Sequence, residues 1–378
     1  MRRSSAVLVV AITGALTASA PALAQEGRAG EAIPGQYIVV AEESRDAGSV
    51  ARWQDARQVR MLDVVNGFAA KLDAQQVRAL RKSARVDYVE ADRVVTVAAT
   101  QTMDSAGEPW GLDRIDQRSR PGSRTYSWTA TGAGVTAYVV DTGIATAHTQ
   151  FGGRAANVYD AFGGNGQDCH GHGTHVAGTI GAATWGVAKG VTLRGVRVLN
   201  CSGNGSTSGI IAALNWIRTN GARPAVANMS LGGGFSSSLN SAATNLSNAG
   251  VFLAVAAGNE SQNACNVSPA SASGVFTTAA SDRNDRRASF SNYGSCVEAY
   301  APGVAIRSTW LSGGINTISG TSMASPHVAG VGALYKQGSP GASSASISNA
   351  IISGATTNVI TSNPSGTPNR LLYKAPTL

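Results

Sequence analysis

The stretch Val139-Val140-Asp141-Thr142-Gly143 ends an apolar run that begins at Val135. A short continuous apolar run closed by turn residues is typical of a strand buried in a parallel sheet. Thr142-Gly143 supplies that turn, so we expect Asp141 at the C-terminal edge of the sheet, where open α/β folds carry their functional sites. The run therefore predicts an α/β fold with a carboxylate at its functional edge.

Apolar segments of strand length alternate with segments of helix length along the following chain. The expected strands are 193–198, 225–229 and 251–256, and the expected helices are 208–218 and 237–248. Such alternation is typical of a doubly wound, mostly parallel sheet with helices on both faces.

A histidine segment and a serine segment follow Asp141 in chain order. His170-Gly171-His172-Gly173-Thr174-His175 leads into a small-residue helix at 176–181, so His172 is expected near a helix start. Ser322 lies in Ser319-Gly320-Thr321-Ser322-Met323-Ala324-Ser325-Pro326-His327, just before a helix-like segment at 323–335. Backbone N–H groups at that helix end are free to bind an oxyanion.

These three residue types form a known catalytic constellation. A serine hydroxyl is a poor nucleophile unless an imidazole takes its proton and a carboxylate holds the imidazole in the right tautomer. We therefore expect Ser322 as nucleophile, His172 as general base and then acid, and Asp141 as the orienting carboxylate. In Val255-Ala256-Ala257-Gly258-Asn259 an apolar strand ends just before Asn259. Its amide and the Ser322 N–H are the expected oxyanion donors.

The motifs around Asp141, His172, Asn259 and Ser322, with three longer ones, resemble the subtilase family, in its proteinase K-like subgroup. The longer motifs are Pro109-Trp110-Gly111-Leu112-Asp113-Arg114-Ile115-Asp116-Gln117, Asn228-Met229-Ser230-Leu231-Gly232-Gly233-Gly234 and Pro368-Asn369-Arg370-Leu371-Leu372-Tyr373. The resemblance runs from about Ala99 to Tyr373 and implies a subtilisin-like fold and serine endopeptidase activity through an acyl-enzyme. His170 departs from the subgroup, which carries asparagine there.

Two other functions fit the sequence less well. A catalytically silent, subtilase-like binding protein would not need all four catalytic positions, which are intact. A lipase or esterase would carry Gly-x-Ser-x-Gly, whereas the residues around Ser322 read Gly-Thr-Ser-Met-Ala.

Substrate is expected to lie as an extended strand between two edge segments, by backbone pairing that ignores side chains. One segment is Gly203, Asn204 and Gly205, and the other is Ser230, Leu231 and Gly232. The S1 pocket would be walled by the second segment and by Ala256, Ala257 and Gly258. Because these walls are small and uncharged, we expect broad specificity with apolar or aromatic P1 side chains.

The N-terminal part of the chain predicts export and a removable domain. Residues 1–24 carry Arg2-Arg3, an apolar core and Ala22-Leu23-Ala24, typical of a secretory signal peptide. Residues 25–98 mix strand and helix patterns: strands at 37–40, 66–72, 86–90 and 94–99, and a helix at 74–81. This part resembles the subtilase propeptide, a small α+β (ferredoxin-like) domain that chaperones folding and inhibits the enzyme. The catalytic domain is then 99–378, released by self-processing, and an attached independent binding module is the alternative for 25–98.

Four cysteines in an exported chain suggest disulfides. Spacing alone leaves three connectivities open, and the resemblance implies Cys169 with Cys201 and Cys265 with Cys296. A zinc site of Cys169, His170 and His175 is a weaker alternative, because a disulfide would consume Cys169.

The resemblance also implies structural Ca²⁺, a cation that prefers oxygen ligands. One candidate site consists of Asp113, Asp116, Gln117, Ser123 and Thr125. A second would use Glu298 with the carbonyls of Ser273 and Val275, although Glu stands there in place of the subgroup's shorter Asp.

The charge and hydropathy restrict the partners. The formal net charge is +8, but no basic run interleaved with aromatic residues accompanies it. A solvated basic surface explains this better than nucleic-acid binding. No segment reaches the roughly 20 apolar residues of a membrane span. We expect a secreted, extracellular monomer whose partners are protein or peptide substrates and its own propeptide, with no nucleic acid and no membrane.

Overall fold

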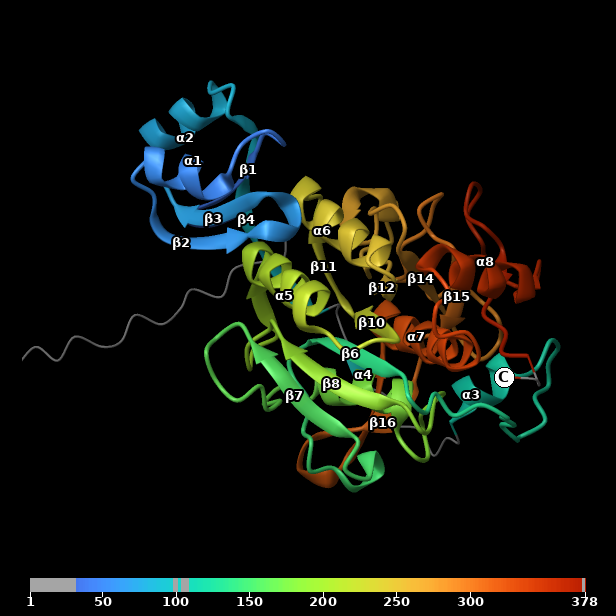
Figure 1. The fold of residues 1–378 in the computed structure, drawn as a ribbon. Helices are drawn as coiled ribbons and strands as arrows, with labels where there is room; N and C mark the ends of the chain where they lie inside the picture. Colours follow the sequence, from blue (N-terminus) through green and yellow to red (C-terminus); the bar gives the residue numbers. More distant parts are fainter. Residues whose placement is uncertain (1–31, 98–100, 103–108, 376–377) are drawn as a thin grey trace, which may run out of the picture.

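The computed structural model describes residues 32–97, 101–102, 109–375 and 378 (Figure 1). The predicted signal peptide at 1–24 lies outside the described residues. A small N-terminal domain packs against one side of a larger α/β domain, over helices α5 (Thr207–Asn220) and α6 (Ser237–Asn248) (Figure 1).

The larger domain is built on a nine-stranded sheet in the order β18-β19-β15-β14-β12-β10-β6-β8-β7. Its strands are β6 (Thr136–Asp141), β7 (Ala155–Asp160), β8 (Thr192–Arg197), β10 (Ala225–Met229), β12 (Phe252–Ala256), β14 (Phe276–Ser281), β15 (Ala299–Pro302), β18 (Thr356–Thr357) and β19 (Arg370–Leu371). The strands pair in parallel except β18 with β19. This confirms the predicted doubly wound, mostly parallel sheet.

Successive residues of the central strands pack on opposite faces of this sheet, as strand geometry requires. In β6, Val139 joins the core under α4 (His172–Gly181) and α7 (Thr321–Gly338), whereas Val140 joins the core under α5 and α6. Because both faces of the central strands are buried, these strands are mostly apolar in the sequence. The remaining helices of the domain are α3 (Trp110–Ile115) and α8 (Ser344–Gly354).

The N-terminal domain is a four-stranded antiparallel sheet with two helices, in the strand order β4-β1-β3-β2. Its elements are β1 (Ala32–Ala41), α1 (Ala47–Trp53), β2 (Arg57–Leu62), β3 (Gly67–Lys71), α2 (Ala74–Arg81) and β4 (Val86–Val97). One face of the sheet shares a core with both helices, as a ferredoxin-like α+β domain requires. The helix predicted at 74–81 matches α2, and Asp73 with Gln76 forms its capping box.

Short elements complete the fold. They are β5 (Gln101–Thr102), β9 (Asn204–Ser206), β11 (Leu231–Gly234), β13 (Val267–Ser268), β16 (Ile306–Thr309), β17 (Ile315–Ser319) and the 3₁₀ turns η1 (Asp63–Val65), η2 (Thr149–Phe151), η3 (Ala264–Asn266) and η4 (Leu311–Gly313).

Some predicted boundaries differ from the structure. The strands expected at 86–90 and 94–99 are one strand, β4, because its first part pairs with β1 and its end pairs with β9 and β11 of the larger domain. Helix α4 begins at His172 itself, and α7 begins at Thr321, so Ser322 lies inside the first turn of α7. Neither α1 nor β2 was predicted from the sequence.

Candidate active site

Asp141 and His172 form a buried pair at the C-terminal edge of the sheet. Asp141 ends β6, and His172 opens α4; both side chains are fully buried. His172 Nδ1 lies 2.8 Å from Asp141 Oδ1 and 3.0 Å from Oδ2. Asp141 Oδ1 also accepts the Thr142 backbone N–H at 2.7 Å. These contacts favour the tautomer with the proton on Nδ1, which leaves Nε2 able to accept a proton.

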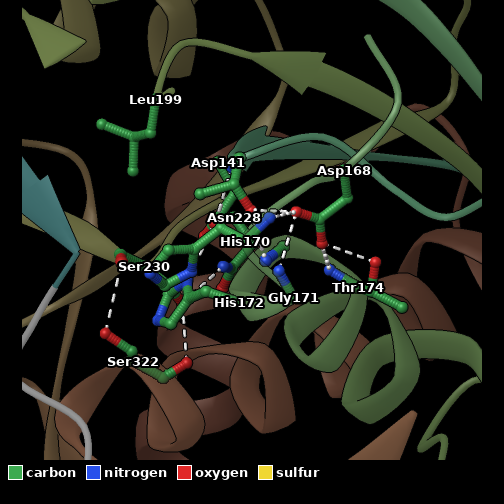
Figure 2. Close-up of polar contacts among 12 residues, drawn as sticks. Asp141, Asp168, His170, Gly171, His172, Thr174, Leu199, Asn228, Ser230 and Ser322 are labelled. Atoms are coloured by element: carbon green, nitrogen blue, oxygen red, sulfur yellow. Dashed lines mark hydrogen bonds and ion pairs between the residues drawn. The ribbon is translucent and has the colours of Figure 1, made fainter. Parts of the chain in front are cut away.

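Ser322 lies opposite Ser230, the residue between β10 and β11. Ser230 Oγ donates to the Ser322 carbonyl at 2.7 Å, and Ser322 Oγ donates to the Ser230 carbonyl at 3.2 Å. The second distance is long for a hydroxyl donor, so this bond is weak. The structure therefore brings Asp141 and His172 into hydrogen-bond contact, while the Ser322 hydroxyl points to Ser230 (Figure 2).

Asn259 lies just beyond β12 with its amide oriented by the start of α7. Its Oδ1 accepts the Thr321 N–H at 2.8 Å and the Thr321 hydroxyl at 2.9 Å. Within the described part of the chain, neither Asn259 Nδ2 nor His172 Nε2 has a hydrogen-bond partner, although both atoms are buried. A buried donor and a buried proton acceptor without partners are costly unless a reacting group uses them.

Asn292 holds the loop that carries Asn259. This fully buried side chain donates through Nδ2 to the Ala257 carbonyl and to Glu260 Oε2, both at 2.8 Å. Its Oδ1 accepts the N–H groups of Glu260 and Gln262 at 3.1 and 2.9 Å. A Cβ on Gly258 would lie 2.3 Å from Asn292 Nδ2, so this close approach requires glycine.

The two expected substrate-binding edges are both occupied by β4 of the N-terminal domain. Thr96 pairs with Asn204 of β9 on one side and with Gly232 of β11 on the other, in antiparallel register. Val95 pairs with Gly205, and Val97 pairs with Leu231. Gly203 lies in the turn before β9. Thus an extended strand of this chain itself fills the predicted groove.

The predicted S1 walls lie at the ends of neighbouring strands. Ser230, Leu231, Ala256, Ala257 and Gly258 are buried, and Gly232 is half-buried. None of these residues carries a charge. The charged residue next along this loop, Glu260, is held by Asn292.

Two acidic residues of β4 contact the N-termini of the helices beneath the N-terminal domain. Glu90 Oε1 accepts the Ser236 hydroxyl at 2.5 Å and the Ser238 N–H at 3.3 Å at the start of α6. Asp92 accepts the Ser208 N–H at 3.0 Å and the Ser208 hydroxyl at the start of α5. Carboxylates are favourable at the positive ends of helices. Burial is nevertheless the main influence on Asp92 and raises its pKa.

His170 and His175 are the other two histidines of the segment around His172, and their surroundings are those of structural residues. His175 is fully buried and its Nε2 contacts the Ile306 carbonyl at 3.0 Å, while burial lowers its pKa to about 3. His170 lies edge-on to His172 with 6.3 Å between ring centroids, and burial followed by the His172 charge lowers its pKa. Among the described residues, no three His, Cys, Asp or Glu side chains gather as a metal site. The zinc alternative therefore has no support in the structure.

Both disulfides have the pairing that the resemblance implies, Cys169 with Cys201 and Cys265 with Cys296. The first joins the loop before His172 to the loop before β9. It therefore connects the histidine segment to one edge of the substrate groove.

The first candidate calcium site is a cluster of oxygen atoms in the segment after α3. Ser123 Oγ lies 3.3 Å from Asp113 Oδ1, 3.3 Å from the Thr125 carbonyl and 2.6 Å from Thr125 Oγ1. Gln117 Nε2 donates to Ser123 Oγ at 2.6 Å and to Asp116 Oδ1 at 3.1 Å, so its amide lies beside these oxygen atoms. Carboxylate, hydroxyl, amide and carbonyl groups are the donors that Ca²⁺ takes, so these residues fit the ion.

The second candidate calcium site has a carboxylate and a carbonyl that already accept hydrogen bonds. Glu298 Oε2 accepts the Thr277 N–H at 2.5 Å, and burial raises the pKa of Glu298 to about 7. The Ser273 carbonyl accepts the Thr244 hydroxyl at 2.7 Å. The site of Glu298 with the carbonyls of Ser273 and Val275 therefore stays a prediction.

Three residues that organise the site were not assigned a role from the sequence: Asp168, Asn292 and Thr321. Asp168 accepts hydrogen bonds from the turn that opens α4 (Figure 2). Thr321 and Asn292 orient Asn259 and its loop. Only the position of Asp168 close before His172 offered a sequence signal.

Comparisons with known proteins agree with this geometry. Residues 132–371 match the model of the subtilase family, and residues 36–98 match that of peptidase inhibitor I9. An extracellular serine proteinase of Thermus sp. (strain Rt41A) is 47% identical, with 95% of this chain and 93% of the relative covered. The subtilisin-like serine protease AsES of Sarocladium strictum is 54% identical over 81% of this chain and 80% of its own length.

A solved structure agrees as well. The crystal structure of a cold-adapted subtilisin-like serine proteinase has a TM-score of 0.69 and 50% sequence identity, covering 71% of this chain and 98% of its own. The chain therefore belongs to the subtilase family, and it is a subtilisin-like serine protease whose catalytic domain follows an I9 propeptide domain.

Proposed function

We propose that this chain is the precursor of a secreted serine endopeptidase that cuts itself at Ala98-Ala99, using Ser322, His172, Asp141 and Asn259. The observation that carries the proposal is the end of β4, which pairs with both β9 and β11 as a substrate strand would. The propeptide thus enters the groove as the first substrate and blocks it after cleavage.

The register of β4 indicates the bond that is cut. Thr96 pairs with Gly232 and Val97 with Leu231, the residue that follows Ser230. Ser230 contacts Ser322 through two hydrogen bonds. The described strand thus approaches Ser322 at its end, which supports cleavage just beyond it, with 25–98 as propeptide and 99–378 as mature enzyme.

The chemistry follows from the polar atoms of the site. Rotation about the Ser322 side-chain bond exchanges the weak contact with Ser230 for one with His172 Nε2. Ser322 Oγ then attacks the carbonyl carbon, and its proton passes to Nε2 while Asp141 stabilises the imidazolium. Asn259 Nδ2 and the Ser322 N–H donate to the oxyanion. His172 next protonates the leaving nitrogen, and a water molecule, deprotonated by His172, hydrolyses the acyl-enzyme.

The uncharged walls around Ser230 and Ala256 favour broad specificity with apolar or aromatic P1 residues. The backbone pairing at β9 and β11 is independent of sequence, so the S1 pocket carries most of the selectivity. A peptide-library cleavage profile dominated by P1 lysine, aspartate or glutamate would contradict this preference.

Secretion is proposed from the pattern of residues 1–24 and from the relative named as extracellular. Within the described residues, every helix is too short or too polar to span a bilayer. We propose that the mature enzyme acts outside the cell as a monomer on proteins and peptides. Nucleic acid and membranes are not among its proposed partners.

Calcium is proposed to bind at Asp113, Asp116, Gln117, Ser123 and Thr125 and to stabilise the fold. A bound ion stabilises only the folded state, by about 2.7 kcal/mol when free calcium is 100 times its Kd. Chelator is therefore expected to lower the Tm by several degrees, and added calcium to restore it. Asp113→Asn should weaken this calcium dependence. No shift in the unmodified protein would refute the site.

Inhibition by the propeptide is expected to weaken as pH rises. Because burial raises the pKa of Asp92 in the complex, the complex binds a proton more tightly than the separated parts. The contribution of Asp92 to the stability of the complex is full below the ordinary carboxyl pKa. It is lost as the pH rises through the raised pKa of Asp92 in the complex. The positive charge of Arg60 lowers the pKa of Asp92 and so opposes the rise caused by burial. Glu90 lies on the same strand as Asp92.

The inhibition constant of the propeptide fragment should accordingly rise by up to tenfold per pH unit between the two pKa values of Asp92. Asp92→Asn should flatten this part of the profile. Glu90→Gln, the matched control, should keep the slope. An unchanged slope in Asp92→Asn would contradict the prediction.

The proposed function is tested directly on the unmodified chain. Phenylmethylsulfonyl fluoride should label Ser322 alone, with the buried Ser230 and Ser325 as internal controls. Mass spectrometry without inhibitor should show a new N-terminus at Ala99. Label on another serine, or a different N-terminus, would overturn the assignment.

A further inference from the structure

Asp168 is a buried carboxylate that accepts five hydrogen bonds close to His172. Its Oδ1 accepts the Thr142 hydroxyl and the N–H groups of His170 and Gly171, each at 2.9 Å. Its Oδ2 accepts the Thr174 N–H at 2.9 Å and the Thr174 hydroxyl at 2.6 Å. The side chain is 9% exposed, and none of these contacts involves substrate-binding residues.

These contacts replace a cap that α4 lacks. The residue before α4, Gly171, offers no side chain to the first turn. The N–H of Thr174 is satisfied by Asp168, and the N–H of Gly173 donates to Thr142 Oγ1 at 2.9 Å. Unsatisfied N–H groups at a helix start need such acceptors, and a carboxylate is the most favourable one.

The same contacts join α4 to the strand that ends in Asp141. Thr142 follows Asp141 directly, and its hydroxyl donates to Asp168 while accepting from Gly173. A Cβ on Gly173 would lie 2.2 Å from the Gly143 carbonyl, so α4 packs directly on the turn after Asp141. One carboxylate therefore ties the backbone beside His172 to the backbone beside Asp141 (Figure 2).

We propose that Asp168 is a positioning residue of the protease: it acts through His172 and Asp141 and touches no reacting atom. The proposal rests on the proposed roles of those two residues and Ser322. Asp168 sets the backbone from which the His172 ring must reach Asp141 with Nδ1 and Ser322 with Nε2. A displacement of about 1 Å at such a ring costs about 10²-fold in rate.

The test replaces Asp168 by asparagine, which has the same shape but turns one acceptor into a donor. Asp168→Asn should lower kcat by about 10- to 100-fold with KM within about twofold. Autoprocessing should slow by the same factor, because β4 already occupies the groove and binding contributes nothing to that rate. Thr142→Val, which removes the hydroxyl shared by Asp168 and Gly173, should reproduce the loss in kcat.

Asp160 provides a matched control. It is also a carboxylate that accepts backbone N–H groups, from Phe162 at 2.9 Å and Gly166 at 3.0 Å, and it pairs with Arg197. It does not contact the turn that opens α4. Asp160→Asn should lower the Tm but leave kcat and KM within about twofold of the wild type.

A double variant separates positioning from general loosening. In the Asp141→Asn background, Asp168→Asn should lower the remaining kcat by less than about twofold, because the alignment that it supports is already lost. Full kcat in Asp168→Asn, or an undiminished loss in the Asp141→Asn background, would overturn the proposal. Activity in Ser322→Ala would instead refute the proposed function itself.

Discussion

Ser322→Ala is expected to leave the precursor uncleaved and to lower protein hydrolysis by about 10⁶-fold, the loss known for the nucleophile of subtilisin. The fold should survive, because within the described residues Ser322 Oγ makes a single weak bond, to the Ser230 carbonyl at 3.2 Å. The β4 strand should remain between β9 and β11 as a permanently bound, uncleaved segment. Mass spectrometry and a casein assay on purified chains are sufficient to check both outcomes.

The matched control is Ser325→Ala, one turn further along α7. Ser325 is also fully buried, and its Oγ donates to Asn228 Oδ1 at 2.7 Å. We expect this variant to lose some stability but to process itself. Cleavage of purified Ser322→Ala would mean that another residue or another protease matures the chain, and adding a trace of wild-type enzyme distinguishes cleavage between molecules.

The parts of this fold that the sequence predicts well are those buried on both sides. Strands β6 and β10 are mostly apolar because each packs into the cores on both faces of the sheet. The two elements that were missed have weaker patterns. Helix α1 (Ala47–Trp53) is only seven residues long, and β2 (Arg57–Leu62) is an edge strand with exposed and charged side chains. Neither shows the periodicity on which such predictions depend.

The candidate site likewise contains residues that the sequence predicts and residues that it does not. Asp141, His172, Asn259 and Ser322 stand at ends of elements that the sequence reveals, so their meeting at one edge of the sheet is predictable. Asp168 is different, because its partners lie between Thr142 and Thr174 and follow no period. The contact of the Ser322 hydroxyl with Ser230 is a side-chain rotamer, which residue types alone do not determine. The bond of Glu298 to the Thr277 backbone is likewise not visible in sequence.

Asp141→Asn has the second-largest expected effect, a fall of about 10⁴-fold in kcat with KM almost unchanged. Both carboxylate oxygens lie within 3.0 Å of His172 Nδ1, and both side chains are fully buried. An amide in this place donates a hydrogen to Nδ1 and moves the histidine proton to Nε2, where it blocks acceptance from Ser322. The variant also lacks the charge that stabilises the imidazolium.

The orienting role of Asp141 is experimentally distinct from a role in binding or stability. The hydrogen bonds that the described residues make to the Asp141 carboxylate come from Thr142 and His172, not from the groove edges β9 and β11. The propeptide fragment should therefore bind Asp141→Asn as tightly as it binds the wild type. A suitable control is Asp282→Asn, which alters a carboxylate that accepts the N–H groups of Asn284 and Arg286 away from the site. Its kcat should stay within about twofold of the wild type. If Asp141→Asn kept kcat within tenfold, or lost activity only through KM, the Nδ1 contact would not govern the proton transfer from Ser322.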